Sequence, residues 1–105
     1  MFTLYEKIAS ISPFYKYHIL GNSMLPTLIS GDSVLVNRIS YWFTLPKIND
    51  IVVVKDPRDG KVLIKRIIKI VEKGYFVQGD NKNSSTDSRV FGMIGRQSII
   101  GKVWF

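Results

Sequence analysis

The 105-residue sequence contains no cysteine, a single histidine and no long apolar run. Without cysteine, disulfides, thiolate catalysis and cysteine metal sites are excluded. One histidine, His18, is too few for a histidine-rich metal site, and a serine–histidine–aspartate triad would have to depend on this residue. No cofactor is expected. The apolar stretches are far shorter than the roughly 20 residues of a membrane-spanning helix, and the charges within residues 1–20 do not fit a signal peptide.

Acidic residues are also few, since 15 Lys and Arg oppose 8 Asp and Glu and leave a net charge of +7. The basic residues are scattered as singles and pairs, without a run of five or more. Of the possible reasons for this charge, the scattered distribution favours solubility first and attraction to an anionic membrane surface second. Nucleic acid ranks last, and no nucleic acid partner is expected.

Short β-type segments separated by turn residues predict an all-β, mainly antiparallel fold, built as a small barrel or sandwich. Residues 1–105 are expected to form a single domain, because the chain shows no linker and no internal repeat. A short amphipathic helix is predicted over residues 3–12, before Pro13. The predicted strands are Phe14–Leu20, Ser33–Asn37, Ile51–Lys55, Val62–Val71, Gly74–Gln78 and Ile99–Phe105.

Ser23 lies between Gly21 and a turn stiffened by Pro26. A serine held at the end of a strand with its backbone N–H exposed has the placement that a nucleophile needs, with a donor close to the developing oxyanion. The segment alone is equally consistent with an ordinary turn serine.

Lys65 belongs to a predicted strand in which alternation puts Leu63, Lys65 and Ile67 on one face. Burial among apolar neighbours disfavours the ammonium form and lowers the pKa of a lysine. A lysine that is neutral near pH 7 can accept a proton from a serine hydroxyl. The alternative is a lysine that extends its ammonium group from the strand to solvent.

Residues 79–89 are rich in glycine, asparagine and short polar side chains, which predicts a self-hydrogen-bonded loop. Asp87 and Arg89 are spaced to form a local pair that holds this loop. Ser85 is placed to point its hydroxyl at the lysine amine and orient it. An exposed loop without a role is the alternative.

Together and in this order, these segments resemble the type I signal peptidase family over about residues 19–105. Ser23 to Thr27 resembles the family's Ser-Met-x-Pro-Thr box, and Gly31 to Val36 is similar to its Gly-Asp-x-Val box. Lys65-Arg66 looks like the lysine box. The last box is resembled by Gly79-Asp80-Asn81, Ser85, Asp87-Ser88-Arg89 and Gly92.

The resemblance implies a signal-peptidase-like fold and a serine endopeptidase that removes a signal, leader or propeptide after small residues through an acyl-enzyme. Ser23 would attack the scissile carbonyl and give its backbone N–H to the oxyanion hole, and Lys65 would be the general base. Ser85 would hydrogen-bond the Lys65 amine, while Asp80, Asp87 and Arg89 would support the loop. The substrate would lie extended beside the strands. The residues implied to contact it are Leu20, Met24, Leu28, Leu63 and Ile64.

Two departures from the family pattern predict a stripped-down site. Gly21 stands where many bacterial members carry a serine whose hydroxyl completes the oxyanion hole. A glycine at this position resembles the pattern of the mitochondrial inner-membrane and nickel superoxide dismutase maturation peptidases. Only residues 66–78 separate Lys65 from Gly79, which leaves no room for the accessory β-domain of larger members. The oxyanion hole is therefore expected to rely on backbone donors.

Two other functions remain open: a self-cleaving repressor-type Ser–Lys domain, and a non-catalytic β-barrel binding module. Membrane association is expected to be peripheral, or to use an anchor outside this sequence, with a cytoplasmic location as the alternative. Tyr41, Trp42 and Phe43 form an aromatic segment that is a candidate for contact with the membrane surface, helped by the positive charge. Packing of this segment into the core is the alternative.

Overall fold

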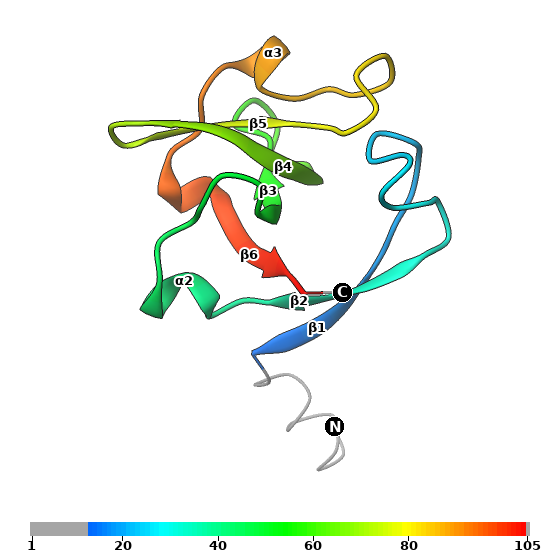
Figure 1. The fold of residues 1–105 in the computed structure, drawn as a ribbon, viewed down its shortest axis with the longest axis horizontal. Coiled ribbons are helices and arrows are strands. Elements are labelled where there is room, and N and C mark those ends of the chain that lie inside the picture. Colours follow the sequence, from blue (N-terminus) through cyan, green and yellow to red (C-terminus); the bar gives the residue numbers. More distant parts are fainter. Residues whose placement is uncertain (1–12, 105) are drawn as a thin grey trace.

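The computed structural model describes residues 13–104, which form an antiparallel six-stranded sheet in the order β1-β2-β6-β3-β4-β5 (Figure 1). Three short helical segments lie between strands: α2 (Ser40–Phe43), α3 (Ser88–Phe91) and the 3-10 helix η1 (Arg96–Ser98). The strands are β1 (Phe14–His18), β2 (Ser33–Asn37), β3 (Ile51–Lys55), β4 (Val62–Val71), β5 (Gly74–Gln78) and β6 (Ile99–Val103).

The predicted all-β, mainly antiparallel fold is confirmed. Four strands, β2 to β5, have the predicted bounds, whereas β1 and β6 end two residues earlier than expected. The three helical segments were not predicted, because elements of three or four residues are too short to show a helical period. The helix predicted over residues 3–12 lies outside the described residues.

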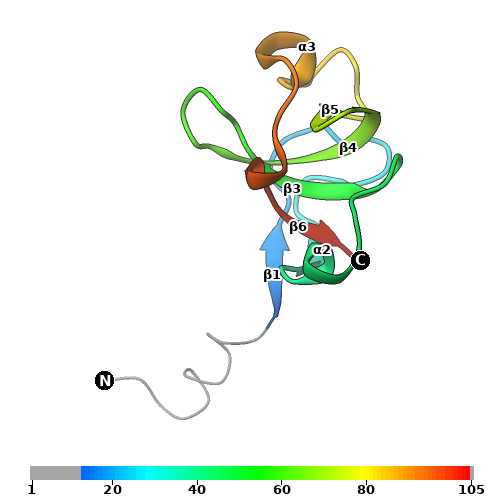
Figure 2. The same ribbon diagram turned by 90° about the vertical axis from the view of Figure 1, so that its left-hand side faces the viewer.

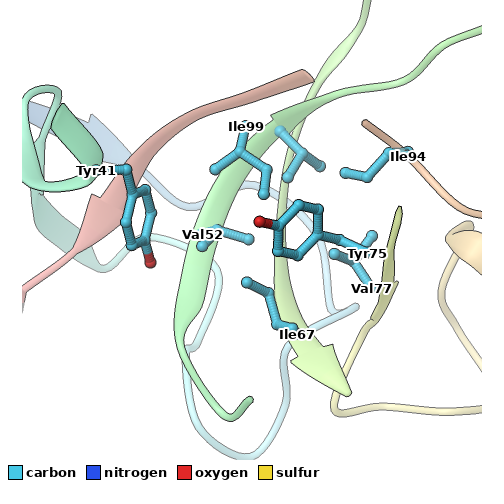
Figure 3. Close-up of a cluster of buried hydrophobic side chains, with 8 residues drawn as sticks. Tyr41, Val52, Ile67, Tyr75, Val77, Ile94 and Ile99 are labelled. Carbon is cyan, nitrogen blue, oxygen red and sulfur yellow. The ribbon is translucent and has the colours of Figure 1, made fainter. Parts of the chain in front are cut away.

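Strand β3 lies at the centre of the sheet, and Val52, Val53 and Val54 are all fully buried. Successive side chains of a strand point to opposite faces, so these valines enter two different hydrophobic clusters. Core cluster 1, shown in Figure 3, consists of Tyr41, Val52, Val54, Ile67, Tyr75, Val77, Ile94 and Ile99. Core cluster 2 consists of Ile19, Met24, Val34, Val36, Val53 and Ile64.

Strand β4 changes partners along its length, and this leaves an unpaired edge. Residues 62–66 pair with β3, whereas pairing with β5 begins only at Arg66. Strand β1 is the end of the sheet and pairs with β2 alone. Among the described residues, β1 and the first half of β4 therefore each present an edge without a strand neighbour.

The aromatic segment divides between core and surface. Tyr41 is buried in core cluster 1, its hydroxyl donates to Asp50 Oδ2 at 2.7 Å, and the Arg96 guanidinium lies 5.3 Å from its ring centroid. The prediction that Tyr41 contacts a membrane is therefore wrong, because tertiary packing has taken up its ring. Trp42 and Phe43 remain 74% and 80% exposed. Within residues 13–104, no helix has the length and apolar character needed to cross a membrane.

Ile67 and Ile68 offer a direct test of the two environments along β4, because Ile67 is fully buried and Ile68 is 42% exposed. Ile67→Ala is expected to lower the free energy of unfolding by about 2–5 kcal/mol through lost transfer energy and a cavity. Ile68→Ala, the matched control, should cost less than about 1 kcal/mol. Urea denaturation would measure both, and equal losses would contradict the assigned register.

Candidate active site

Ser23 and Lys65 line the same cavity, which has a volume of about 70 Å³. The cavity lies where β1 and its extension meet the unpaired half of β4. Its volume is room for a few water molecules, which is the scale of a small side chain. The other lining residues are Tyr17, Ile19, Leu20, Met24, Val62, Leu63 and Ile64.

Four of the five residues predicted to contact substrate are therefore brought together: Leu20, Met24, Leu63 and Ile64. Leu28 does not line this cavity and instead packs against core cluster 2. The alternation predicted for β4 is confirmed, since Leu63 packs against core cluster 1 and Ile64 belongs to core cluster 2.

The turn that carries Ser23 requires glycine at position 21. Gly21 has a φ of +86°, a conformation that side chains with a Cβ rarely adopt, although the space around it is open. Its N–H donates to Ser30 Oγ at 3.2 Å. The Ser23 N–H and hydroxyl have no hydrogen-bond partner within residues 13–104, whereas the Ser23 carbonyl accepts from Asn81 N at 2.9 Å.

Lys65 is 2% exposed, and its amine makes no hydrogen bond or ion pair with another described residue. Burial lowers the pKa of Lys65, and the positive charge of Arg89 lowers it further, while the Asp87 carboxylate acts in the opposite direction. The neutral amine therefore forms at a lower pH than it does in an exposed lysine. The alternative of an ammonium extended to solvent does not fit this burial.

The Asp87 carboxylate holds the loop of residues 79–89. It is fully buried and accepts five hydrogen bonds, from the N–H of Gly79, the Ser85 hydroxyl, and the backbone and two guanidinium nitrogens of Arg89. Burial raises its pKa, but these bonds outweigh burial and lower the pKa to about 2. Asp87 also caps the N-terminus of α3. The expected pairing of Asp87 with Arg89 is present, at 2.9 Å.

Gly79 lets this loop touch the turn that carries Ser23. A Cβ at Gly79 would lie 2.6 Å from the Ser23 carbonyl oxygen and closer still to the Ser85 hydroxyl, so only glycine fits between them. Next to it, Asn81 Nδ2 donates to the Asn22 carbonyl at 3.0 Å. Segments more than fifty residues apart in sequence thus lie in contact, as the loops on the right of Figure 1 show.

A second carboxylate, Asp80, links three segments. It accepts from the Thr27 hydroxyl and forms a bidentate pair with Arg66 at 2.8 and 2.9 Å, and these donors lower its pKa, with Arg66 as the larger cause. Arg66 also donates to the Asn49 carbonyl at 3.1 Å. Sequence reasoning gave no role to Thr27 or Arg66. Both residues lie in segments that resemble family boxes, but these segments indicate no contact partner, and the alternation of β4 only turns Arg66 away from the face of Lys65.

Ser85 was predicted to hydrogen-bond the Lys65 amine. Its hydroxyl donates to Asp87 Oδ2 at 2.7 Å. Because a hydroxyl oxygen has two further lone pairs, this bond leaves Ser85 able to accept from an amine N–H. No hydrogen bond joins Ser85 and Lys65 in this structure, so the orienting role of Ser85 stays a prediction.

An antiparallel β-fold with a serine and a buried lysine on one cavity has the architecture expected of a Ser–Lys peptidase. Comparison with known proteins gives the family directly. The sequence model of the family described as "Signal peptidase, peptidase S26" matches residues 2–70 and 69–105. The chain belongs to this family. The match favours the signal peptidase reading over the self-cleaving repressor and the binding module.

Curated relatives come from bacteria and organelles. The chain is 37% identical to the mitochondrial ATP-independent inner membrane protease subunit 1a of Arabidopsis thaliana, over 81% of the chain and 65% of the relative. It is 29% identical to the probable signal peptidase I-1 of Synechocystis sp., over 84% of the chain and 68% of the relative. It is 31% identical to signal peptidase I V of Bacillus subtilis, over 86% of the chain and 83% of the relative. The chain thus spans about two thirds of the first two relatives.

The buried Asp87 predicts a specific loss of stability in acid. Because its folded pKa of about 2 lies below the ordinary aspartate value of roughly 3.9, its contribution is present at neutral pH and lost as pH falls from about 5 toward 2. That contribution is roughly 2–3 kcal/mol. Asp87→Asn should lower stability at pH 7 and flatten its acid dependence, as measured by urea denaturation at several pH values. The exposed Asp59→Asn is the control, and an unchanged acid slope in Asp87→Asn would contradict the assignment.

Proposed function

We propose that this chain is a serine endopeptidase that removes a signal, leader or propeptide, with Ser23 as nucleophile and Lys65 as general base. The observation that carries the proposal is the shared cavity, in which a serine whose hydroxyl has no hydrogen-bond partner among residues 13–104 lies with a buried lysine that forms no ion pair with those residues. A lysine buried without an ion pair needs a reason, since desolvation of its charge is costly and the Asp87 carboxylate offsets that cost only in part. A base for an adjacent serine is such a reason.

The hydrogen bonds around Ser85 would direct the amine lone pair. Asp87 is ionised, with a pKa of about 2, and therefore only accepts, so the Ser85 proton is committed to it. Ser85 Oγ can then only accept from Lys65. An amine N–H directed at Ser85 leaves the nitrogen lone pair for the Ser23 proton. Lys65 would take that proton during attack, give it to the leaving amine, and then activate the deacylating water.

The oxyanion would be stabilised by backbone. The Ser23 N–H has no partner among the described residues, so it is available to the developing negative charge. The Asn81 bonds to the Asn22 and Ser23 carbonyls hold the peptide group that carries this N–H and the peptide group that follows it. A donor that is already held in place costs little reorganisation during the reaction.

The substrate would bind as an added strand between the two free edges. The Ile19 N–H donates to the Asp32 carbonyl, and the Ile19 carbonyl accepts from the Gly31 N–H. The N–H and carbonyl of His18 therefore point the other way, into the gap. On β4, the Lys61 carbonyl accepts from Asp56 N, so the Val62 carbonyl also points into the gap. An extended peptide placed there would pair with both edges and bring its scissile carbonyl to Ser23. The small cavity favours small side chains beside the cut.

Acylation of Ser23 tests this chemistry. Treatment with a penem-type acylating inhibitor should add the inhibitor mass to the wild type and not to Ser23→Ala. Lys65→Met should fold, because the side chain is buried, and should react at least 100-fold more slowly for want of a base. Intact-protein mass spectrometry provides the measurement, with cleavage of a leader-bearing peptide panel as the functional readout. An adduct that persists in Ser23→Ala would refute the nucleophile assignment.

The pH dependence of acylation separates the base from the nucleophile. Only neutral Lys65 can accept a proton, so the rate should rise with pH through the pKa of Lys65, which lies below the ordinary lysine value of about 10.4. Lys65→Met should lack this rise. A wild-type rate that is independent of pH would exclude Lys65 as the base.

A peripheral membrane contact is a second proposal, made by the exposed side chains of α2 and the segment after it. Trp42, Phe43, Leu45 and Ile48 are 54–80% exposed, and Lys47 lies among them. Aromatic and apolar side chains next to a cation suit the interface of an anionic bilayer. In Figure 1, α2 lies at the lower left and the loop carrying Ser23 at the right, so such a contact would leave the cavity uncovered.

Co-sedimentation with vesicles containing anionic lipid, at low salt, tests this contact. Replacing both Trp42 and Phe43 by Ser should reduce the bound fraction at least tenfold, because burying each large side chain contributes roughly 1.5–3 kcal/mol. Val90→Ser removes an exposed apolar side chain from α3 and is the control. Binding that is unaffected by the double change, or no binding by the wild type, would refute the proposal.

A further inference from the structure

Tyr17 spans the gap that the substrate would occupy. Its side chain lines the cavity together with Ser23 and Lys65, and its hydroxyl donates to the carbonyl of Val62 at 3.4 Å. Tyr17 belongs to β1 and Val62 opens β4, strands that are not neighbours in the sheet. The bond therefore crosses between the two free edges.

The Val62 carbonyl is an acceptor that an added strand would use. It points away from β3, because the neighbouring Lys61 carbonyl points toward β3 and accepts from Asp56 N. Val62 is three residues along β4 from Lys65, or about 10 Å at the usual rise of a strand. The peptide residue opposite Val62 would thus be roughly three residues from the scissile bond.

We infer that the Tyr17 hydroxyl is a latch on the substrate gap, which competes with a peptide N–H for the Val62 carbonyl and so sets the affinity of the cleft for extended substrates. The inference rests on the function proposed above. At 3.4 Å the bond is longer than the roughly 2.5–3.0 Å of a usual O–H···O hydrogen bond and is therefore weak, which suits a contact that each substrate has to break. The Tyr17 ring is half-buried against core cluster 2, so its hydroxyl is held close to the gap when no peptide is bound.

Tyr17→Phe tests the latch, because it keeps the ring and removes the hydroxyl. The variant should bind an extended peptide with alanine at the first and third positions before the cut two- to tenfold more tightly, the range that one net hydrogen bond supplies. In cleavage assays KM should fall by the same factor while kcat stays unchanged, because the latch stabilises only the free enzyme and its loss favours bound substrate and transition state equally. Tyr15→Phe removes a hydroxyl from the same face of β1, outside the cavity, and is the matched control.

Binding is measured in a Ser23→Ala background by isothermal titration calorimetry, so that it does not depend on cleavage. Tighter binding after Tyr17→Phe, with Tyr15→Phe unchanged, supports the latch. Unchanged or weaker binding after Tyr17→Phe overturns it. If the wild type fails to cleave the peptide panel, the proposed peptidase function fails, whereas the Ser23→Ala titrations still decide whether Tyr17 obstructs an extended peptide.

Discussion

The arrangement of the site depends on one buried carboxylate, that of Asp87. Its five hydrogen bonds tie the start of the loop at Gly79, the middle at Ser85 and the end at Arg89 to a single point. A buried charge is tolerated only when its hydrogen bonds replace the lost water, and here the depressed pKa shows that they do. The same carboxylate bears on the pKa of Lys65, where it opposes the effect of burial. Loop structure and lysine protonation are therefore coupled through Asp87.

The free edges of β1 and β4, between which the substrate is proposed to bind, are also a hazard, because an unpaired edge invites pairing with another chain. Charged residues flank the exposed backbone, with Lys16 within β1 and Lys61 immediately before β4. Lysines at an edge disfavour association with a second sheet while leaving room for a single peptide. Among the described residues, the proposed substrate gap thus lies between β1, which ends the sheet, and the point at which β4 changes its strand partner.

The sequence was sufficient for most strands and for selecting Ser23 and Lys65 as candidates that line one cavity, since both depend on local pattern. Alternation alone placed Lys65 with Leu63 and Ile67, and turn residues delimited β2 to β5. The position of Tyr41 could not be predicted, because an aromatic segment is equally apolar whether it faces the core or solvent. Contacts between distant segments were equally inaccessible: nothing in the local sequence of Thr27 or Arg66 indicates that Asp80 joins them.

The backbone of the turn that carries Ser23 explains why position 21 is a glycine and not the serine that many bacterial family members carry. A serine at this position would have to adopt a φ of +86°, which is unfavourable for a residue with a Cβ even though the surrounding space is open. A hydroxyl donor there would therefore require a different path of the chain before Ser23. With the path as it is, the proposed oxyanion hole would depend on the Ser23 N–H, whose position is held by the Asn81 bonds to the two adjoining carbonyls. By positioning the loop, Asp87 would then contribute to the proposed oxyanion hole as well as to the environment of Lys65.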